Sequence, residues 1–309
     1  MLKRVSILLT IAASAWAAEP GTLDPAHWKI GGATIDVEFT PGRFDLPRAA
    51  VLKWVENAAR SVTVYFGRFP VPHARIRITP YAGSSGVFNG TTWGTEGSLT
   101  RVSLGEHTSQ DELDMDWMMT HELVHTGFPD VDNQHHWMEE GMATYVEPIA
   151  RAQAGLMDIK RVWSEMARFM PKGQPAAYDQ GLDRTHSWGR TYWGGALFCL
   201  LADVQIREQT KNRKGLQDAL RAIVAAGGNI DEEWPLRRAF EVGDKATGTS
   251  VLVTLYDQMK ETPVKADLDA LWKRLGVELA GNAVSFNDKA PLAVVRRAIT
   301  KPVLSEPRP

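Results

Sequence analysis

Residues 117 to 128 read WMMTHELVHTGF and carry two histidines four positions apart, His121 and His125, with Glu122 beside the first. In an α-helix, side chains four residues apart lie one above the other, so both imidazoles can present a nitrogen to one metal ion. Glu122 is rotated one step from His121 and can reach a water on that ion without binding the ion itself. The pattern predicts a hydrolytic zinc site with Glu122 as general base, and a helix with two ordinary histidines is the alternative.

Such a site needs a third protein ligand, because catalytic zinc keeps three protein ligands and leaves one position open for water. A metzincin pattern would place a glycine and a histidine downstream, where this chain has Phe128 and Val131. An acidic pair, Glu139 and Glu140, stands at the head of the helical segment that follows. A glutamate ligand from this second segment therefore fits better than a third histidine.

The segment WMEEGMATYVE resembles the W-L-x-E-G-x-A-x-Y run of gluzincin metallopeptidases, the M1 aminopeptidase and peptidase MA-like superfamily. In that superfamily the glutamate before the glycine is the third zinc ligand, which implies Glu140 here, with Glu139 as the fallback. The resemblance also implies Zn²⁺ as cofactor, a zinc-activated water and a peptide or protein as substrate. His135 and His136 are competing ligands from the connecting loop, and ordinary loop or helix-start residues are the other interpretation of both.

A second resemblance lies downstream, where TYWGGALFCLLADVQIRE looks like the Y-x-K-G-A-x-x-L helix start of the same peptidases. There a tyrosine donates its hydroxyl to the oxyanion formed when water attacks the peptide carbonyl, which implies this role for Tyr192. Gly194 stands where the family pattern has lysine. The alternative for Tyr192 is an ordinary aromatic packing residue.

One departure from the family concerns the substrate-binding edge strand. Family aminopeptidases carry G-x-M-E-N there, and its glutamate grips the free amine of the substrate. The corresponding region reads GVFNGTTWG, with Asn89 but no glutamate at the matching place. We therefore expect cleavage inside chains, or without a strict need for a free amine, unless Glu96 or Glu106 from neighbouring loops substitutes.

Two kinds of secondary structure follow one another along the chain. Alternating apolar residues predict strands over residues 33–40, 73–81, 87–94 and 98–105. Apolar residues at helical spacing predict a helix over 49–66. Helical patterns then dominate, apart from a short terminal strand, over 137–153, 158–168, 191–210, 214–226, 234–240, 249–260 and 266–275. Ser109 and Glu112 form a capping box, so the helix carrying the histidine pair is expected to begin there.

This order predicts an α+β fold, with a small mixed sheet lobe over 18–108 followed by a mostly helical lobe with the zinc-binding helices over 109–309. The resemblance implies a thermolysin-like two-lobe metallopeptidase unit.

The first seventeen residues, MLKRVSILLTIAASAWA, have two basic residues, an apolar run and a small-residue A-x-A end. This arrangement predicts a cleaved secretory signal over 1–17 and a secreted or periplasmic protein. A membrane anchor is the alternative, but the apolar run is too short to cross a bilayer. We expect no stable membrane insertion.

The composition is that of an ordinary globular protein, with 44% hydrophobic and 23% charged residues. A formal net charge of −2 provides no basic surface for nucleic acid, so we expect no nucleic-acid partner. Cys199, the only cysteine, lies in an apolar helical run and is interpreted as a buried hydrophobe rather than a catalytic thiol. The sequence leaves the oligomeric state open. It also leaves two competing functions, a catalytically silent zinc-containing peptide- or protein-binding module and a zinc hydrolase of another amide or ester.

Overall fold

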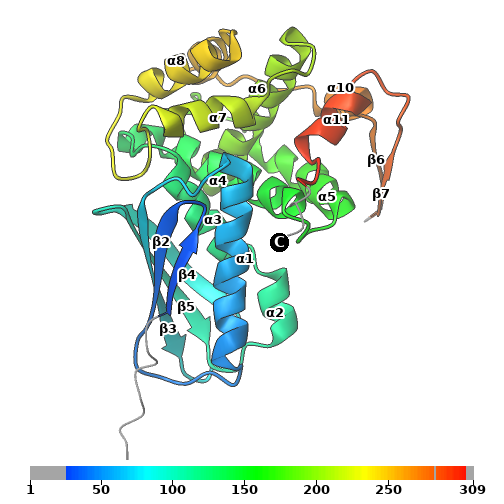
Figure 1. Cartoon of the computed structure of the whole chain (residues 1–309). Coiled ribbons are helices and arrows are strands. Elements are labelled where there is room, and N and C mark those ends of the chain that lie inside the picture. The colour runs from blue at the N-terminus through cyan, green and yellow to red at the C-terminus, as the bar shows by residue number, and fades with distance from the viewer. Residues whose placement is uncertain (1–25, 282, 304–309) are drawn as a thin grey trace, which may run out of the picture.

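The computed structural model describes residues 26–281 and 283–303, so the predicted signal over 1–17 lies outside the described residues. A sheet with one long helix along it forms the lower part of the molecule, and a group of helices forms the upper part (Figure 1). The predicted α+β organisation, a small mixed sheet followed by a helical region, is confirmed.

Five strands form one mixed sheet in the order β1-β2-β3-β5-β4, and their bounds are β1 Ala26–Ile30, β2 Ala33–Phe39, β3 His73–Tyr81, β4 Val87–Gly94 and β5 Ser98–Gly105. The inner strands β2, β3 and β5 run parallel, while β1 and β4 pair antiparallel at the two edges. In β3 the side chains of Ala74, Ile76 and Ile78 are fully buried on one face, as period-2 alternation requires. The sheet therefore presents β4 as an edge strand beside the helices.

The helices follow the order α1 Arg48–Phe66, α2 Gln110–Met115, α3 Met118–Val124, α4 His136–Gln153, α5 Ile159–Phe169, α6 Gly195–Gln209, α7 Leu216–Ala225, α8 Leu236–Thr247, α9 Val251–Met259, α10 Leu268–Leu275 and α11 Ala293–Ile299. Helix α1 connects the parallel strands β2 and β3 and lies along the sheet (Figure 1). Among the described residues, no helix combines the length and the apolar character needed to cross a membrane.

Helix α4 is the centre of the helical lobe and contacts α1, α3, α5 and α6. A side-chain carbon added at Gly141 in α4 would overlap the backbone of Gly195 in α6, and one added at Gly195 would overlap the carbonyl oxygen of Trp137. Only glycine allows two helical backbones to approach this closely. Gly141, which follows Glu139 and Glu140, is therefore needed for the close packing of α4 against α6.

The prediction of one helix running from Ser109 into the histidine pair is wrong, because α2 and α3 are separate. Helix α2 does begin with the predicted capping box at Ser109. The helix then ends at Asp116, which has an extended backbone. The Asp116 carboxylate accepts hydrogen bonds from the backbone nitrogens of Met118 and Met119 and from the indole of Trp54. The first backbone N–H groups of a helix have no carbonyl acceptor in a preceding turn. The Asp116 carboxylate accepts from two of them, so α3 starts as a separate helix.

Three smaller features also differ from the sequence prediction. The short edge strand β1 is absent from the sequence prediction, although its five residues alternate between apolar and polar, and none of its side chains is fully buried. The single terminal strand is a hairpin of β6 (Val277–Ala280) and β7 (Ala283–Phe286), followed by α11. Helix α8 also continues to Thr247, beyond the predicted end at 240, and ends at Gly248 with a left-handed backbone.

A buried carboxylate holds the start of α4 in place. Asp183 is 7% exposed and lies 3.0 Å from Nδ1 of His135, while it accepts hydrogen bonds from the Trp137 indole at 2.7 Å and the Tyr256 hydroxyl at 3.0 Å. Two of these residues come immediately before, or in the first turn of, the helix that carries Glu140. Asp183 therefore fixes where α4 begins relative to α9.

Replacing Asp183 by alanine leaves three buried polar groups without their partner. We expect Asp183→Ala to lower the free energy of unfolding by about 2–4 kcal/mol, measured by chemical denaturation. The matched control is Glu241→Ala, an exposed carboxylate in α8, which should change stability by no more than about 0.5 kcal/mol. Equal effects of the two substitutions would contradict the anchoring role.

Candidate metal centre and catalytic cleft

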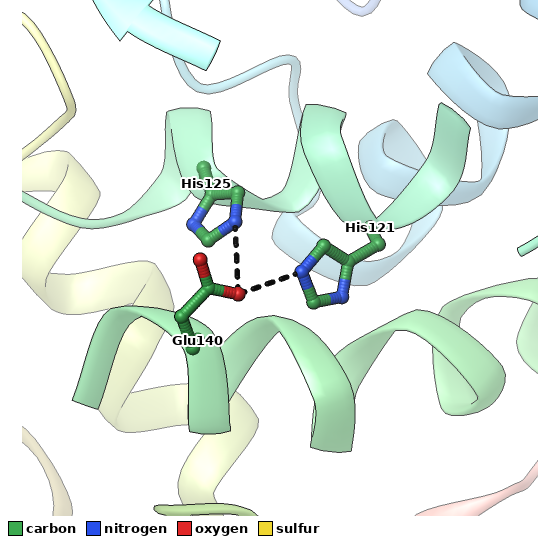
Figure 2. A group of neighbouring side chains, drawn as sticks. All are labelled: His121, His125 and Glu140. Carbon is green, nitrogen blue, oxygen red and sulfur yellow. Dashed lines mark hydrogen bonds and ion pairs between the residues drawn. The ribbon is translucent and has the colours of Figure 1, made fainter. Parts of the chain in front are cut away.

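The structure brings His121, His125 and Glu140 together between α3 and α4. Nε2 of His121 lies 3.0 Å from Oε2 of Glu140, and Nε2 of His125 lies 3.8 Å from the same oxygen. Figure 2 shows both imidazoles and the carboxylate converging from two facing helices. One ligand atom from each of the three residues lies within 4.8 Å of the others. His125 stands at the carboxyl end of α3, where the helix tightens into a 3₁₀ turn.

These separations fit a zinc ion. Two atoms each 2.0–2.1 Å from zinc at the tetrahedral angle lie roughly 3.3 Å apart, between the two observed distances. The set of two imidazoles and one carboxylate is that of a catalytic zinc with an open fourth position. Nε2 of His121 is the nitrogen that faces Glu140, while its Nδ1 is buried and has no hydrogen-bond partner among the described residues.

The protonation states also suit metal binding. Burial and the neighbouring His121 lower the pKa of His125 to about 4, so this imidazole is neutral at neutral pH. Burial opposes ionisation of Glu140, but the hydrogen bond with His121 and the nearby histidines lower its pKa to about 2. A neutral imidazole and an ionised carboxylate are the forms that ligate a divalent cation.

The three competing ligands occupy other positions. Glu139 lies 3.1 Å from Nδ1 of His136 and is not one of the three converging groups. Nδ1 of His135 lies against the Asp183 carboxylate, and His135 is not one of the three converging groups. His136 is half exposed, and its Nε2 lies 3.4 Å from Oε1 of Glu140, the carboxylate oxygen turned away from the His121 nitrogen. His136 thus contacts the third candidate ligand without joining the group.

Glu122 lies against the edge strand β4 and is 7% exposed. The Thr92 hydroxyl lies 2.9 Å from its Oε2 and 3.0 Å from its backbone oxygen. A side-chain carbon added at Gly90 would lie 2.6 Å from Oε1 of Glu122, so a larger residue at this position would displace the Glu122 side chain. Burial raises the pKa of Glu122, while His121 and the Thr92 hydrogen bond oppose the rise. A carboxylate with a raised pKa and a fixed orientation suits a general base.

Tyr192 reaches the same site from a π-helical segment, η4 (Gly189–Gly194), that leads into α6. Its ring stacks on the His121 ring at a centroid distance of 6.2 Å. Burial, followed by the Glu140 and Glu122 carboxylates, raises the pKa of Tyr192 to about 12, so the phenol stays protonated and can donate. The Tyr192 side chain therefore lies beside the candidate ligands, at the position that the resemblance implies.

These residues share a cleft of about 780 Å³. Residues 90–94 of β4 and a loop over 230–233 both contribute to the lining. The loop lies against the end of β4, because Gly94 contacts Ile230 and the Gly97 amide donates to Asp231 at 2.8 Å. Besides Glu122 and Glu140, the lining contains five acidic residues, called the acidic wall below: Asp130, Glu139, Asp231, Glu232 and Glu233. Sequence reasoning missed this loop, whose only signal is the acidic run before Trp234.

The edge-strand residues are distributed differently from the expectation. Asn89 has a left-handed backbone with φ 55°, lies at a bulge in β4 and is exposed, and it does not line the cleft. Glu96 lies in the turn after β4, while Glu106 binds Arg43 and the backbone of Gly83. Neither glutamate lines the cleft, so neither lies where a replacement for the family's amine-gripping glutamate would be needed.

Solved structures share this fold, although no protein-family profile matches the sequence and no curated protein matches it. An aminopeptidase N family protein from Idiomarina loihiensis is 14% identical, with a TM-score of 0.63 over 82% of this chain and 49% of that one. An M1 zinc metallopeptidase mutant from Deinococcus radiodurans bound to a Tyr-Ser-Ala substrate is 14% identical, with a TM-score of 0.51 over 80% and 54%. A two-domain M1 zinc metallopeptidase mutant bound to L-tryptophan gives 15% and 0.51 over 79% and 52%.

The chain thus spans about half the length of these structures. At this level of identity the likeness concerns the fold. The small mixed sheet followed by helices is the arrangement of an M1 peptidase domain.

The geometry predicts which substitutions remove the metal. Purified protein should hold about one equivalent of zinc, and His121→Ala, His125→Ala and Glu140→Ala should each lower it well below one, measured by elemental analysis. The matched control is Glu139→Ala, one residue from the candidate ligand, which should retain the metal. Loss of zinc in Glu139→Ala with retention in Glu140→Ala would move the third ligand by one position, and full zinc in every variant would exclude the site.

Proposed function

We propose that this protein is a secreted or periplasmic zinc-dependent peptidase of the gluzincin type. The observation that carries the proposal is the convergence of His121, His125 and Glu140 next to Glu122, a buried carboxylate that is not one of the three. The M1 zinc metallopeptidases among the similar solved structures support a peptidase function in general and zinc as the metal. The secretory leader motif at 1–17 supports export.

In this proposal His121, His125 and Glu140 hold the zinc, which supplies a Lewis acid that makes a water a competent nucleophile near neutral pH. Glu122 accepts the proton of that water as it attacks the peptide carbonyl and then returns the proton to the leaving amine. Its hydrogen bond with Thr92 keeps the carboxylate in one orientation throughout. The Tyr192 hydroxyl donates a hydrogen bond to the oxyanion that develops on the carbonyl.

The free edge of β4 is the feature that orients the substrate. A peptide can add to this edge as a further strand, with backbone hydrogen bonds that are independent of its side chains. The cleft-lining part of β4 begins at Gly90, which contacts Glu122, so the scissile bond lies beside that glycine. No carboxylate projects from β4 at the place where an aminopeptidase grips the free amine, which favours cleavage without a free amino terminus.

Two other functions share the same fold and are separated from this one by experiment. A catalytically silent binding module would hold zinc and bind peptides without turnover. Such a module would not need a buried, oriented carboxylate beside the metal ligands. The presence of Glu122 in that position favours a hydrolase over a binding module. A hydrolase of another amide or ester would use the same groups on a different substrate.

The role of Glu122 predicts a loss of turnover without loss of metal. Glu122→Gln keeps the size of the side chain but removes the base, so we expect full zinc content and a fall in kcat/KM of about 10²–10⁴-fold on a peptide selected from a library. Tyr192→Phe should cost about 10²-fold, as expected for one oxyanion donor. Equal cleavage by wild type and Glu122→Gln would refute the mechanism, and zinc without any cleavage by wild type would favour the binding module.

The missing glutamate on β4 predicts tolerance of blocked peptides. Paired peptides with free and acetylated amino termini should be cleaved with kcat/KM values within about one order of magnitude, because no dedicated amine contact is lost. Mass spectrometry of the products should show internal cuts. Release of single amino-terminal residues only, abolished by acetylation, would instead make the acidic wall of the cleft an amine-binding site.

A further inference from the structure

A second cavity of about 310 Å³ opens beside the metal centre, on the side of α4 and α5. It shares three lining residues with the catalytic cleft, Trp117, His121 and Tyr192. The two spaces therefore lie next to each other, with the candidate ligand His121 in the lining of both. A substrate lying along β4 with its scissile bond at Glu122 passes the mouth of this cavity.

Two tryptophans stand exposed at the mouth. Trp117 is 49% exposed and meets the His121 ring edge-on at 5.1 Å, and Trp188 is 59% exposed and stacks on Tyr192 at 5.7 Å. The ring surface of an exposed indole is apolar, and a cluster of such rings at a cavity is typical of a surface that a ligand covers. The residues held at the mouth are therefore suited to contact an apolar group.

Most of the lining surface of this cavity is apolar. The apolar residues in the lining include Met166, Phe169, Met170, Trp193 and Ala196.

The carboxylates of this cavity have partners. Glu147 binds Arg151 at 3.0 Å, and Glu165 binds Arg161 at 2.7 Å. The ammonium group of Lys172 lies over the Phe169 ring at 4.5 Å. The described lining therefore offers no unpaired carboxylate to a cationic side chain, in contrast to the acidic wall at the other part of the cleft.

We propose that this cavity is a specificity pocket that takes a large apolar or aromatic side chain from the substrate residue next to the cleaved bond. The inference rests on the proposed peptidase function for the identity of its ligand. Its volume lies at the lower end of the range for small-ligand sites, which suits one side chain rather than a folded segment. Burial of such a side chain against aromatic rings supplies the selectivity, because each extra buried carbon group favours binding.

The test begins with a library of blocked peptides digested by the wild-type zinc protein. One position flanking the cut should be enriched in Phe, Tyr, Trp, Leu or Met, and a synthetic peptide with Phe there should exceed its Ala counterpart in kcat/KM by roughly 10- to 100-fold. Trp188→Ala opens the mouth and Thr144→Phe fills the interior from α4, so both should reduce this Phe-to-Ala ratio toward one. The matched control is Tyr178→Ala, an aromatic residue 98% exposed and outside the cavity, which should leave the ratio unchanged.

A binding measurement separates failure of this inference from failure of the proposed function. Glu122→Gln protein is titrated with N-acetyl-L-phenylalaninamide and N-acetyl-L-alaninamide, and binding is followed by tryptophan fluorescence and chemical-shift changes. The aromatic probe should bind at least several-fold more tightly, and adding Thr144→Phe should remove the difference. If wild type cleaves no peptide, the proposed function fails and this comparison alone decides on the pocket. Equal binding of the two probes, a preference for Lys or Arg beside the cut, or ratios unchanged by both pocket variants would overturn the assignment.

Discussion

The close crossing of α4 and α6 at Gly141 and Gly195 is the constraint on which the site depends. Because neither position has room for a side chain, the two helical backbones are in direct contact. Glu140 directly precedes one glycine, and Tyr192 lies three residues before the other, so the crossing brings a carboxylate and a phenol to the same place. A larger residue at either glycine would push the helices apart and separate these groups. The π-helical turn of η4, a distortion often found at functional sites, then sets the direction in which Tyr192 points.

Two glutamates of the cleft differ in the direction of their pKa shift. Burial raises the pKa of Glu122, whose Thr92 hydrogen bond and His121 neighbour only partly compensate. Glu140 is also buried, but the histidines around it more than offset burial and lower its pKa. One carboxylate is therefore suited to exchange a proton, and the other is suited to remain an anion. Two groups of one chemical type can take different roles in a hydrolytic site in this way.

The cleft has different surroundings on its two sides. An acidic loop over 230–233 faces β4 on one side, and an aromatic cavity bordered by Trp117 and Trp188 opens on the other. The acidic loop and Trp188 come from parts of the helical lobe distant in sequence from the histidines, whereas Trp117 stands four residues before His121. The fold is shared with M1 peptidase structures, and these surrounding segments give the cleft of this chain its own lining.

The sequence by itself was sufficient for the main elements and for the three residues that converge between α3 and α4. The spacing of His121 and His125 is a local property of helical turns, and period-2 alternation in β3 follows directly from burial on one face. Resemblance to a known motif distinguished Glu140 from its neighbour, and resemblance again pointed to Tyr192. Only the tertiary structure showed what surrounds them. It showed that the helix ends at Asp116, that Glu96 and Glu106 lie outside the cleft, and that an acidic wall and an aromatic cavity are present. These features depend on contacts between residues far apart in the chain, whose energies are not encoded in any local pattern.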